Sequence, residues 1–158
     1  MLDVQNTIPY IAHRVAWKYR VILNRIIRQA GHRITPEEFI VLDYLAYHGP
    51  ASQKELSTAT YKGKANVTRL MRRLLEEQYV VRERAVDDRR FYKISLTKKG
   101  RHTVKTLVPL FLEFTDMVKR HYGGDKLAVL RESLSDFSNC LDSAYLEFDE
   151  TQKHNTQS

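Results

Sequence analysis

The side chains best suited to chemistry in this sequence lie just after Lys62, where groups that can contact nucleic-acid bases recur at helical spacing. Asn66 can form a pair of hydrogen bonds with an adenine edge, and Arg69 can pair with guanine or bind a phosphate. The methyl group of Ala65 can contact that of thymine. These residue types at this spacing predict base recognition rather than catalysis.

Positive charge is concentrated around these residues. From Lys62 to Lys105 the chain has 14 lysines and arginines against five acids, a net charge of +9. The whole chain of 158 residues has a net charge of +7, so the remainder sums to −2. A basic segment within an otherwise nearly neutral chain is the electrostatic pattern of a nucleic-acid binder.

An amphipathic helix from about Gly63 to Glu77 must present these side chains. Its buried face is predicted to hold Val67, Leu70, Met71 and Leu74. Its other face carries mostly cations: Lys62, Ala65, Arg69, Arg72, Arg73 and Glu76. The stretch from Ser52 to Glu55 has the capping-box pattern and should open a short helix to about Thr58. A short helix, a turn and a basic helix predict a helix-turn-helix, whose second helix lies in the major groove of DNA.

Two strands should follow this basic helix. Tyr79 to Arg84 reads as the first strand, and in Phe91 to Leu96 the residues Tyr92, Ile94 and Leu96 alternate with the other three. A charged turn joins the strands. A hairpin directly after a helix-turn-helix predicts a winged helix, with its wing tip at residues 85–90.

Further helices should flank this lobe. Pro9 begins a helix of about 22 residues that ends near Gly31, and Thr35 caps a second helix that stops at Gly49. The first helix has a second, partly aromatic face, formed by Tyr10, His13, Trp17, Arg20 and Asn24. This face is interpreted as packing on another helix or on a partner subunit, with a small-molecule pocket as the alternative.

After the hairpin, Thr97 should cap a helix that kinks near Pro109 and ends at Gly123. A heptad pattern then follows, at Leu127, Leu130, Leu134, Phe137, Leu141, Ala144 and Phe148. A narrow apolar seam of this kind usually pairs with another helix. We therefore expect a mainly α (α+β) fold with an N-terminal dimerisation helix (1–34), a DNA-binding lobe (35–100), C-terminal dimerisation helices (101–148) and a flexible tail (149–158).

Other function classes fit the sequence poorly. The six histidines are scattered, no glycine-rich phosphate loop follows a strand, and Cys140 has no basic partner nearby in sequence. We therefore predict no enzyme activity, no metal site and no cofactor. A single cysteine and the absence of an apolar run of about 20 residues predict a cytoplasmic protein without a membrane segment. The alternative function is an architectural or protein-contact winged helix without operator specificity.

The sequence resembles the MarR family of bacterial transcriptional regulators over about residues 9–148. The resemblance rests on five segments in this order: Thr35-Pro36-Glu37-Glu38-Phe39-Ile40-Val41-Leu42, Gln53-Lys54-Glu55-Leu56, Val67-Thr68-Arg69-Leu70 with Leu74-Leu75-Glu76, Asp88-Arg89-Arg90, and Leu96-Thr97-Lys98-Lys99-Gly100. It implies a repressor that binds a palindromic operator as an obligate homodimer with intertwined terminal helices. It also implies release by a small effector, often an aromatic carboxylate.

The resemblance and the helix geometry together define the expected sites. Expected DNA contacts are Ser52, Gln53, Lys62, Lys64, Ala65, Asn66, Thr68, Arg69, Arg72, Arg73, Asp88, Arg89, Arg90 and Lys93, with Arg90 matching the minor-groove arginine of the family. Expected effector contacts are Tyr10, His13, Trp17, Arg20, Tyr44 and Tyr47. Expected dimer contacts are Ile11, Val15, Leu127, Leu130, Leu134, Phe137, Leu141 and Phe148.

The sequence also departs from the family pattern. Gln78 stands where a left-handed glycine usually ends the recognition helix, and Ala85-Val86 stand where Asp-Pro is common at the wing tip. The N-terminal region lacks the reactive cysteine of peroxide-sensing members. Cys140 is instead expected to be an inert buried thiol beside the heptad seam.

Overall fold

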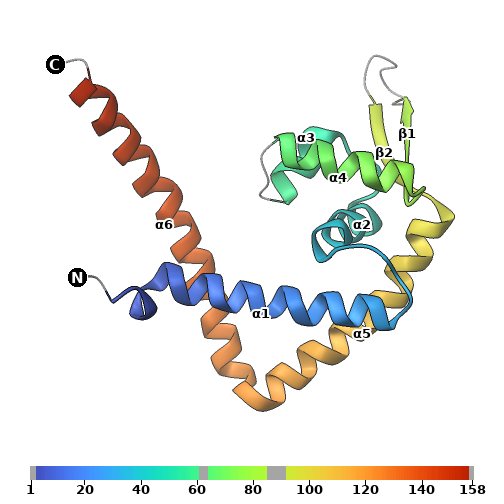
Figure 1. The fold of residues 1–158 in the computed structure, drawn as a ribbon, viewed down its shortest axis with the longest axis horizontal. Coiled ribbons are helices and arrows are strands. Elements are labelled where there is room, and N and C mark those ends of the chain that lie inside the picture. Colours follow the sequence, from blue (N-terminus) through green and yellow to red (C-terminus); the bar gives the residue numbers. More distant parts are fainter. Residues whose placement is uncertain (1–2, 61–63, 85–91, 157–158) are drawn as a thin grey trace. The chain divides into compact units, whose positions relative to one another are not determined.

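The computed structural model describes residues 3–60, 64–84 and 92–156 (Figure 1). Its elements are a short 3-10 helix η1 (Val4–Asn6), α1 (Ile8–Gln29), α2 (Pro36–His48), α3 (Gln53–Ala59), α4 (Lys64–Glu76), β1 (Val80–Arg84), β2 (Tyr92–Leu96), α5 (Lys98–Tyr122) and α6 (Gly124–Thr156). This mostly helical chain with a two-stranded sheet confirms the predicted mainly α fold with a winged helix-turn-helix.

The chain divides into two compact units, Met1–Leu112 and Glu113–Ser158, and the boundary falls within α5. The core of the first unit includes Leu42 of α2, Leu56 of α3, Leu74 of α4 and Leu107 of α5, all essentially inaccessible to solvent. The predicted apolar face of α4 is therefore buried against the neighbouring helices. Burial of this face leaves the basic face of α4 to the solvent.

Both predicted capping boxes are present. The Thr35 hydroxyl accepts a hydrogen bond from the Glu38 amide at 3.2 Å, and the Glu38 carboxylate accepts one from the Thr35 amide at 2.7 Å. Ser52 and Glu55 repeat the arrangement at 3.2 and 2.7 Å. These reciprocal bonds satisfy amides that a helix start otherwise leaves unpaired, which is why α2 and α3 begin where the sequence indicated.

The hairpin is tied to the start of α3. Strands β1 and β2 pair antiparallel from Val80↔Leu96 to Arg84↔Tyr92. The other edge of β2 exchanges two backbone hydrogen bonds, at 2.8 and 3.1 Å, between Ile94 and Ala51. This bridge fixes the base of the wing relative to the helix-turn-helix, and the predicted wing tip at 85–90 lies outside the described residues.

A close junction joins the end of α4 to the start of α5. Gln78 has a φ of +58°, the left-handed conformation that the missing glycine predicted. The Thr97 hydroxyl donates to the Gln78 carbonyl at 2.7 Å and accepts from the Gly100 amide at 3.1 Å, which confirms Thr97 as a cap. A Cβ atom at Gly100 would lie 2.2 Å from the Tyr79 carbonyl oxygen, so only glycine fits there. The segment from Leu96 to Gly100 thus has a structural role.

Replacing Gln78 with glycine is expected to raise the free energy of unfolding by about 1 kcal/mol, because glycine adopts a positive φ without a Cβ clash. Urea denaturation followed by circular dichroism at one protein concentration would measure the change. Gln29→Gly, at the end of α1, is the matched control and should instead lower stability, because that residue is helical. A loss of stability in Gln78→Gly would contradict the strain at this position.

Helix α5 ends where the sequence predicted, and helix α6 extends beyond its predicted end. Helix α5 is continuous through Pro109 and ends before Gly123, whose φ is +97°. Helix α6 extends to Thr156, so residues 149–156, expected as a flexible tail, are helical in the structure. An ion pair between Asp149 and Lys153 at 2.6 Å contributes to this extension. Within the described part of the chain, no helix combines the length and apolarity that a membrane span requires.

Candidate nucleic-acid interface

The solvent-facing side of α4 carries the residues predicted to read bases. Asn66 and Arg69 are exposed, and neither has a hydrogen bond or ion pair with another described residue. Arg72 is also exposed and forms only a loose surface pair with Glu76, at 3.7 Å. Lys64 and Ala65 lie in the first turn of α4, and Lys62 lies outside the described residues. Polar groups without protein partners are available to a ligand.

Helix α3 supplies residues that also hold α4 in place. The Gln53 side-chain amide donates to the Thr68 hydroxyl at 2.8 Å, so two predicted DNA contacts bind each other. The Ser52 hydroxyl accepts the Glu55 amide as the cap of α3. Hydrogen bonding to Ser52 lowers the pKa of Glu55, so this carboxylate stays charged beside the basic surface. Both Ser52 and Gln53 therefore have structural partners in the free protein.

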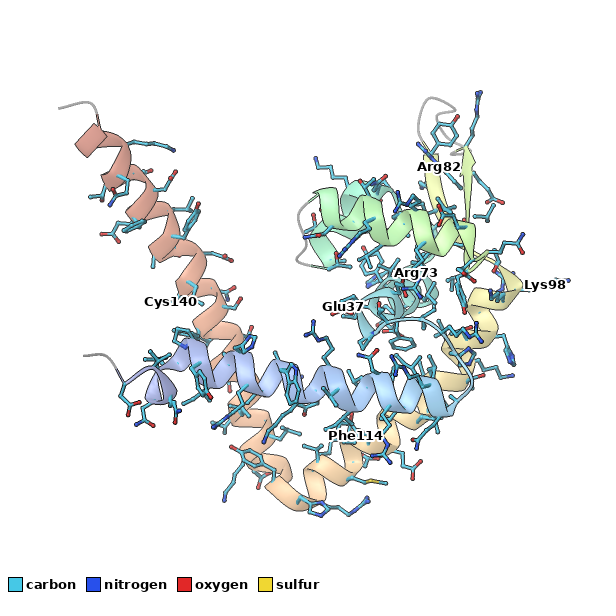
Figure 2. The ribbon with its side chains drawn as sticks, in the orientation of Figure 1. Glu37, Arg73, Arg82, Lys98, Phe114 and Cys140 are labelled. Carbon is cyan, nitrogen blue, oxygen red and sulfur yellow. The ribbon has the colours of Figure 1, made fainter. Side chains whose placement is uncertain are left out.

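Arg73 is exposed like its neighbours, but its guanidinium has two protein partners. Its Nε atom lies 3.3 Å from a carboxylate oxygen of Glu38, and its Nη2 atom donates to the Arg33 carbonyl at 2.8 Å. The guanidinium lies between α4 and α2 (Figure 2). Arg73 was expected to contact a phosphate, and in the free chain two of its guanidinium nitrogens, Nε and Nη2, already have protein partners.

The hairpin contributes two arginines that were not among the expected DNA contacts. The Arg82 guanidinium stacks on the Tyr92 ring at 4.2 Å from the ring centre, and that of Arg84 lies at 6.0 Å. Arg82 is visible on the hairpin in Figure 2. The alternation of arginines opposite an aromatic residue could have signalled this cluster. Lys93 is exposed on β2, whereas Asp88, Arg89 and Arg90 lie outside the described residues.

Two of the predicted effector residues line separate cavities of the described chain, Arg20 a polar cleft and Tyr44 a groove. A polar cleft of about 640 Å³ is lined by Arg20, Thr35, Glu37, Glu38, Asn66, Arg69, Leu70, Arg72, Arg73 and Glu76, and Arg20 is the one predicted effector residue among them. Tyr10, His13 and Trp17 lie on α1 outside that lining. Tyr44 lines a separate groove against α3, and Tyr47 packs edge-on against His48 at 4.8 Å. The four residues of α1 share one helix face, whereas Tyr44 and Tyr47 lie on α2, and sequence spacing within each helix could not reveal how the two sets are placed.

The predicted dimer residues are open to solvent in the single chain. On α1, Ile11 and Val15 are exposed by 41% and 45%. On α6, Leu130, Leu134, Phe137, Leu141 and Phe148 are exposed, and Leu127 is half-buried. Cys140, expected to be buried, is exposed beside them. An apolar seam this open in one chain is typical of a helix that packs against a partner.

Comparison with known proteins finds a family similarity that covers the basic helix α4. Residues 33–90, which span α2 to the wing, match the family model described as MarR family. The uncharacterized HTH-type transcriptional regulator YsmB of Bacillus subtilis is 26% identical over 132 residues, covering 84% of this chain and 86% of that protein. Over residues 33–90, this chain is similar to the MarR family.

Solved structures of two bacterial proteins have the same fold. The Staphylococcus aureus MepR–DNA complex superposes with a TM-score of 0.77 at 19% identity, covering 88% of this chain and 99% of that one. BpsR of Bordetella bronchiseptica, studied for regulation of DNA binding by 6-hydroxynicotinic acid, superposes with a TM-score of 0.77 at 21% identity, covering 87% and 97%. At these identities the likeness establishes the winged-helix fold.

Proposed function

We propose that this protein is a transcriptional repressor that binds a palindromic DNA operator as a homodimer. The observation that carries the proposal is the exposure of Asn66 and Arg69 on α4, without partners in the described chain, beside the other cations of that helix. Their side chains match the donor and acceptor pattern of base edges in the major groove. MepR, a protein of the same fold, has been solved bound to DNA.

The remaining proposed DNA contacts divide by position. Lys62, Lys64, Thr68 and Arg72 flank the base-reading residues and are suited to phosphates, which set the register on the duplex without reading sequence. Arg90 at the wing is suited to a narrow A·T-rich minor groove, where the potential is most negative. Even six phosphate contacts per dimer would produce a slope of about −5 for log affinity against log salt concentration.

The dimer supplies the second copy of this surface. The exposed apolar residues of α1 and α6 are the proposed contacts, within N-terminal (1–34) and C-terminal (101–148) dimerisation regions around a DNA-binding lobe at 35–100. A twofold axis between two recognition helices requires half-sites about one helical turn apart. Bound in this way over a promoter, the dimer would exclude polymerase, which is the basis for proposing repression.

Selection of bound sequences from random duplex DNA tests this function directly. A recovered palindrome, with half-sites about one turn apart, is the expected result. Affinity for the selected duplex should exceed that for unrelated DNA by about a thousandfold or more. Equal binding to every duplex would instead indicate an architectural protein and would overturn the proposal.

The polar cleft beside α4 is the proposed effector site. Arg20, Arg69 and Arg72 offer guanidinium groups to a small aromatic carboxylate there. We expect 6-hydroxynicotinic acid, or another member of an aromatic acid panel, to raise the melting temperature of the protein in a thermal-shift assay. Arg20→Ala should abolish the shift, whereas Arg25→Ala, on α1 outside the cleft lining, should keep it. A shift that survives Arg20→Ala would exclude this cleft.

The wing arginine provides a separate prediction. Arg90→Ala is expected to lower operator affinity by about tenfold or more while the dimer stays intact, because a minor-groove arginine contacts DNA and not the partner. A gel-shift titration measures the affinity, and light scattering measures the mass. Unchanged affinity in that titration would remove Arg90 from the interface.

A further inference from the structure

We propose that Glu38 and Arg73 form a positioning pair that holds the recognition helix α4 in the orientation required to read bases. This inference rests on the proposed function and assigns these two residues a part in it. Arg73 Nε lies 3.3 Å from a Glu38 carboxylate oxygen. The pair connects the third turn of α4 to the first turn of α2.

Glu38 is a rare type of residue for a protein interior. It is 2% exposed, and each oxygen of its carboxylate has a separate partner. One oxygen accepts the Thr35 amide at 2.7 Å to close the capping box, and the other faces Arg73. A capping box alone needs no burial of the glutamate, as the exposed Glu55 of the second box demonstrates. Burial of a charge requires the arginine as its counterion.

Arg73 uses its guanidinium as a bridge. Besides Glu38, it reaches the Arg33 carbonyl at 2.8 Å, so one side chain of α4 is anchored both to α2 and to the connection before it. The planar guanidinium fixes two directions at once, which a lysine ammonium cannot do. The anchor therefore restrains both the rotation of α4 about its axis and its distance from α2.

The base-reading residues lie directly beside this anchor. Arg69 precedes Arg73 by one helical turn, and Asn66 precedes Arg69 by a further turn. Asn66, Arg69, Glu38 and Arg73 line the same cleft. Base contacts tolerate little displacement, because their hydrogen bonds require donor–acceptor distances near 3 Å. A shift of the Glu38–Arg73 pair is therefore expected to displace Arg69 and Asn66, which lie only one and two helical turns away on the same helix.

Charge removal at Glu38 distinguishes positioning from simple electrostatics. Glu38→Gln keeps a capping box, because glutamine serves at that position, but it places an amide against Arg73 instead of a carboxylate. The variant is more positive, so electrostatics alone would tighten DNA binding. Loss of positioning would weaken binding to the operator and leave binding to unrelated DNA unchanged. The two explanations thus predict opposite signs.

The experiment measures affinities of full-length variants for the selected operator and for an unrelated duplex over a range of salt concentrations. Glu38→Gln, Arg73→Gln and Arg73→Lys are each expected to lower the operator affinity by about tenfold, and the Glu38→Gln/Arg73→Gln double variant is expected to do no worse than either single change. Binding to the unrelated duplex and the salt slope should stay as in wild type.

Two matched controls complete the design. Glu55→Gln changes the equivalent residue of the exposed capping box and should not weaken operator binding. Arg72→Gln, beside Arg73, should weaken binding to both duplexes and reduce the salt slope by about 1 per protomer, the signature of a lost phosphate contact. Circular dichroism and light scattering verify that each variant is a folded dimer. If Glu38→Gln does not fold, Arg73→Lys tests the same ion pair, because it changes the partner whose side chain is exposed.

Three results would overturn the inference. Wild-type or tighter operator binding by Glu38→Gln would exclude positioning. An Arg73→Gln variant that behaves like Arg72→Gln would make Arg73 a phosphate contact, and full activity of Arg73→Lys would remove the need for the bridge. If the wild-type protein showed no preference for any duplex, the proposed function itself would be wrong. The pair could then have no role in base reading.

Discussion

Replacing both Leu134 and Leu141 with lysine is expected to dissociate the proposed dimer and to lower operator affinity by about a hundredfold or more. Both leucines lie on the apolar seam of α6 and are 53% exposed in the single chain. Packing a seam against a partner buries them, and a lysine ammonium in that position would lose its hydration without gaining a counterion. Each released subunit would then bind a single half-site and would lose the gain in affinity that comes from two linked half-site contacts.

Analytical ultracentrifugation measures the mass, and a gel-shift titration on the selected operator measures the affinity. Ser135→Lys with Asn139→Lys is the matched control, because these residues lie on the opposite side of α6 and add the same charge. The control should remain a dimer and bind the operator at least as well as wild type. A dimeric Leu134→Lys/Leu141→Lys variant would place the dimer contacts elsewhere.

Replacing Arg69 with alanine should have the second large effect. A bidentate contact between an arginine and a base contributes about 1–3 kcal/mol of discrimination, and a dimer has two copies of each contact. Operator affinity is therefore expected to fall by about thirtyfold or more. Arg69 forms no hydrogen bond or ion pair within the described chain, so its removal leaves no buried group unsatisfied.

Sequence selection with the Arg69→Ala protein would separate base reading from charge. The recovered palindrome should lose its preference at one symmetric pair of positions, and affinity for unrelated DNA should fall far less than affinity for the operator. Arg72→Ala is the comparison, since it removes the same charge from the same helix. Identical behaviour of the two variants on both duplexes would assign Arg69 to phosphate.

Local interactions account for what could be predicted from the sequence. The starts of α2 and α3 followed from Thr35 with Glu38 and from Ser52 with Glu55, because each capping box involves residues three positions apart. The left-handed conformation of Gln78 likewise followed from its place after the recognition helix. The amphipathic pattern of α4 determined which face is buried, since helix geometry alone sets the faces.

The sequence was less informative for residues whose partners come from other elements. A helical wheel correctly placed Arg73 on the exposed face of α4, but it could not reveal the partners of Arg73, Glu38 and the Arg33 carbonyl, which are supplied by a segment far earlier in the chain. The six expected effector residues shared aromatic or cationic character, yet Arg20 lines the cleft beside α4 whereas Tyr44 lines a separate groove against α3.

The sequence by itself determined where the helices and strands lie and which face of α4 is basic, because these depend on contacts within a few residues. The tertiary structure alone decided which side chains of that face have partners on other elements. Asn66, Arg69 and Arg72 project to solvent, whereas Arg73 is held by a buried carboxylate of α2. The physical reason is that a counterion for a buried charge is chosen by proximity in space, which chain packing creates and spacing along the sequence does not record.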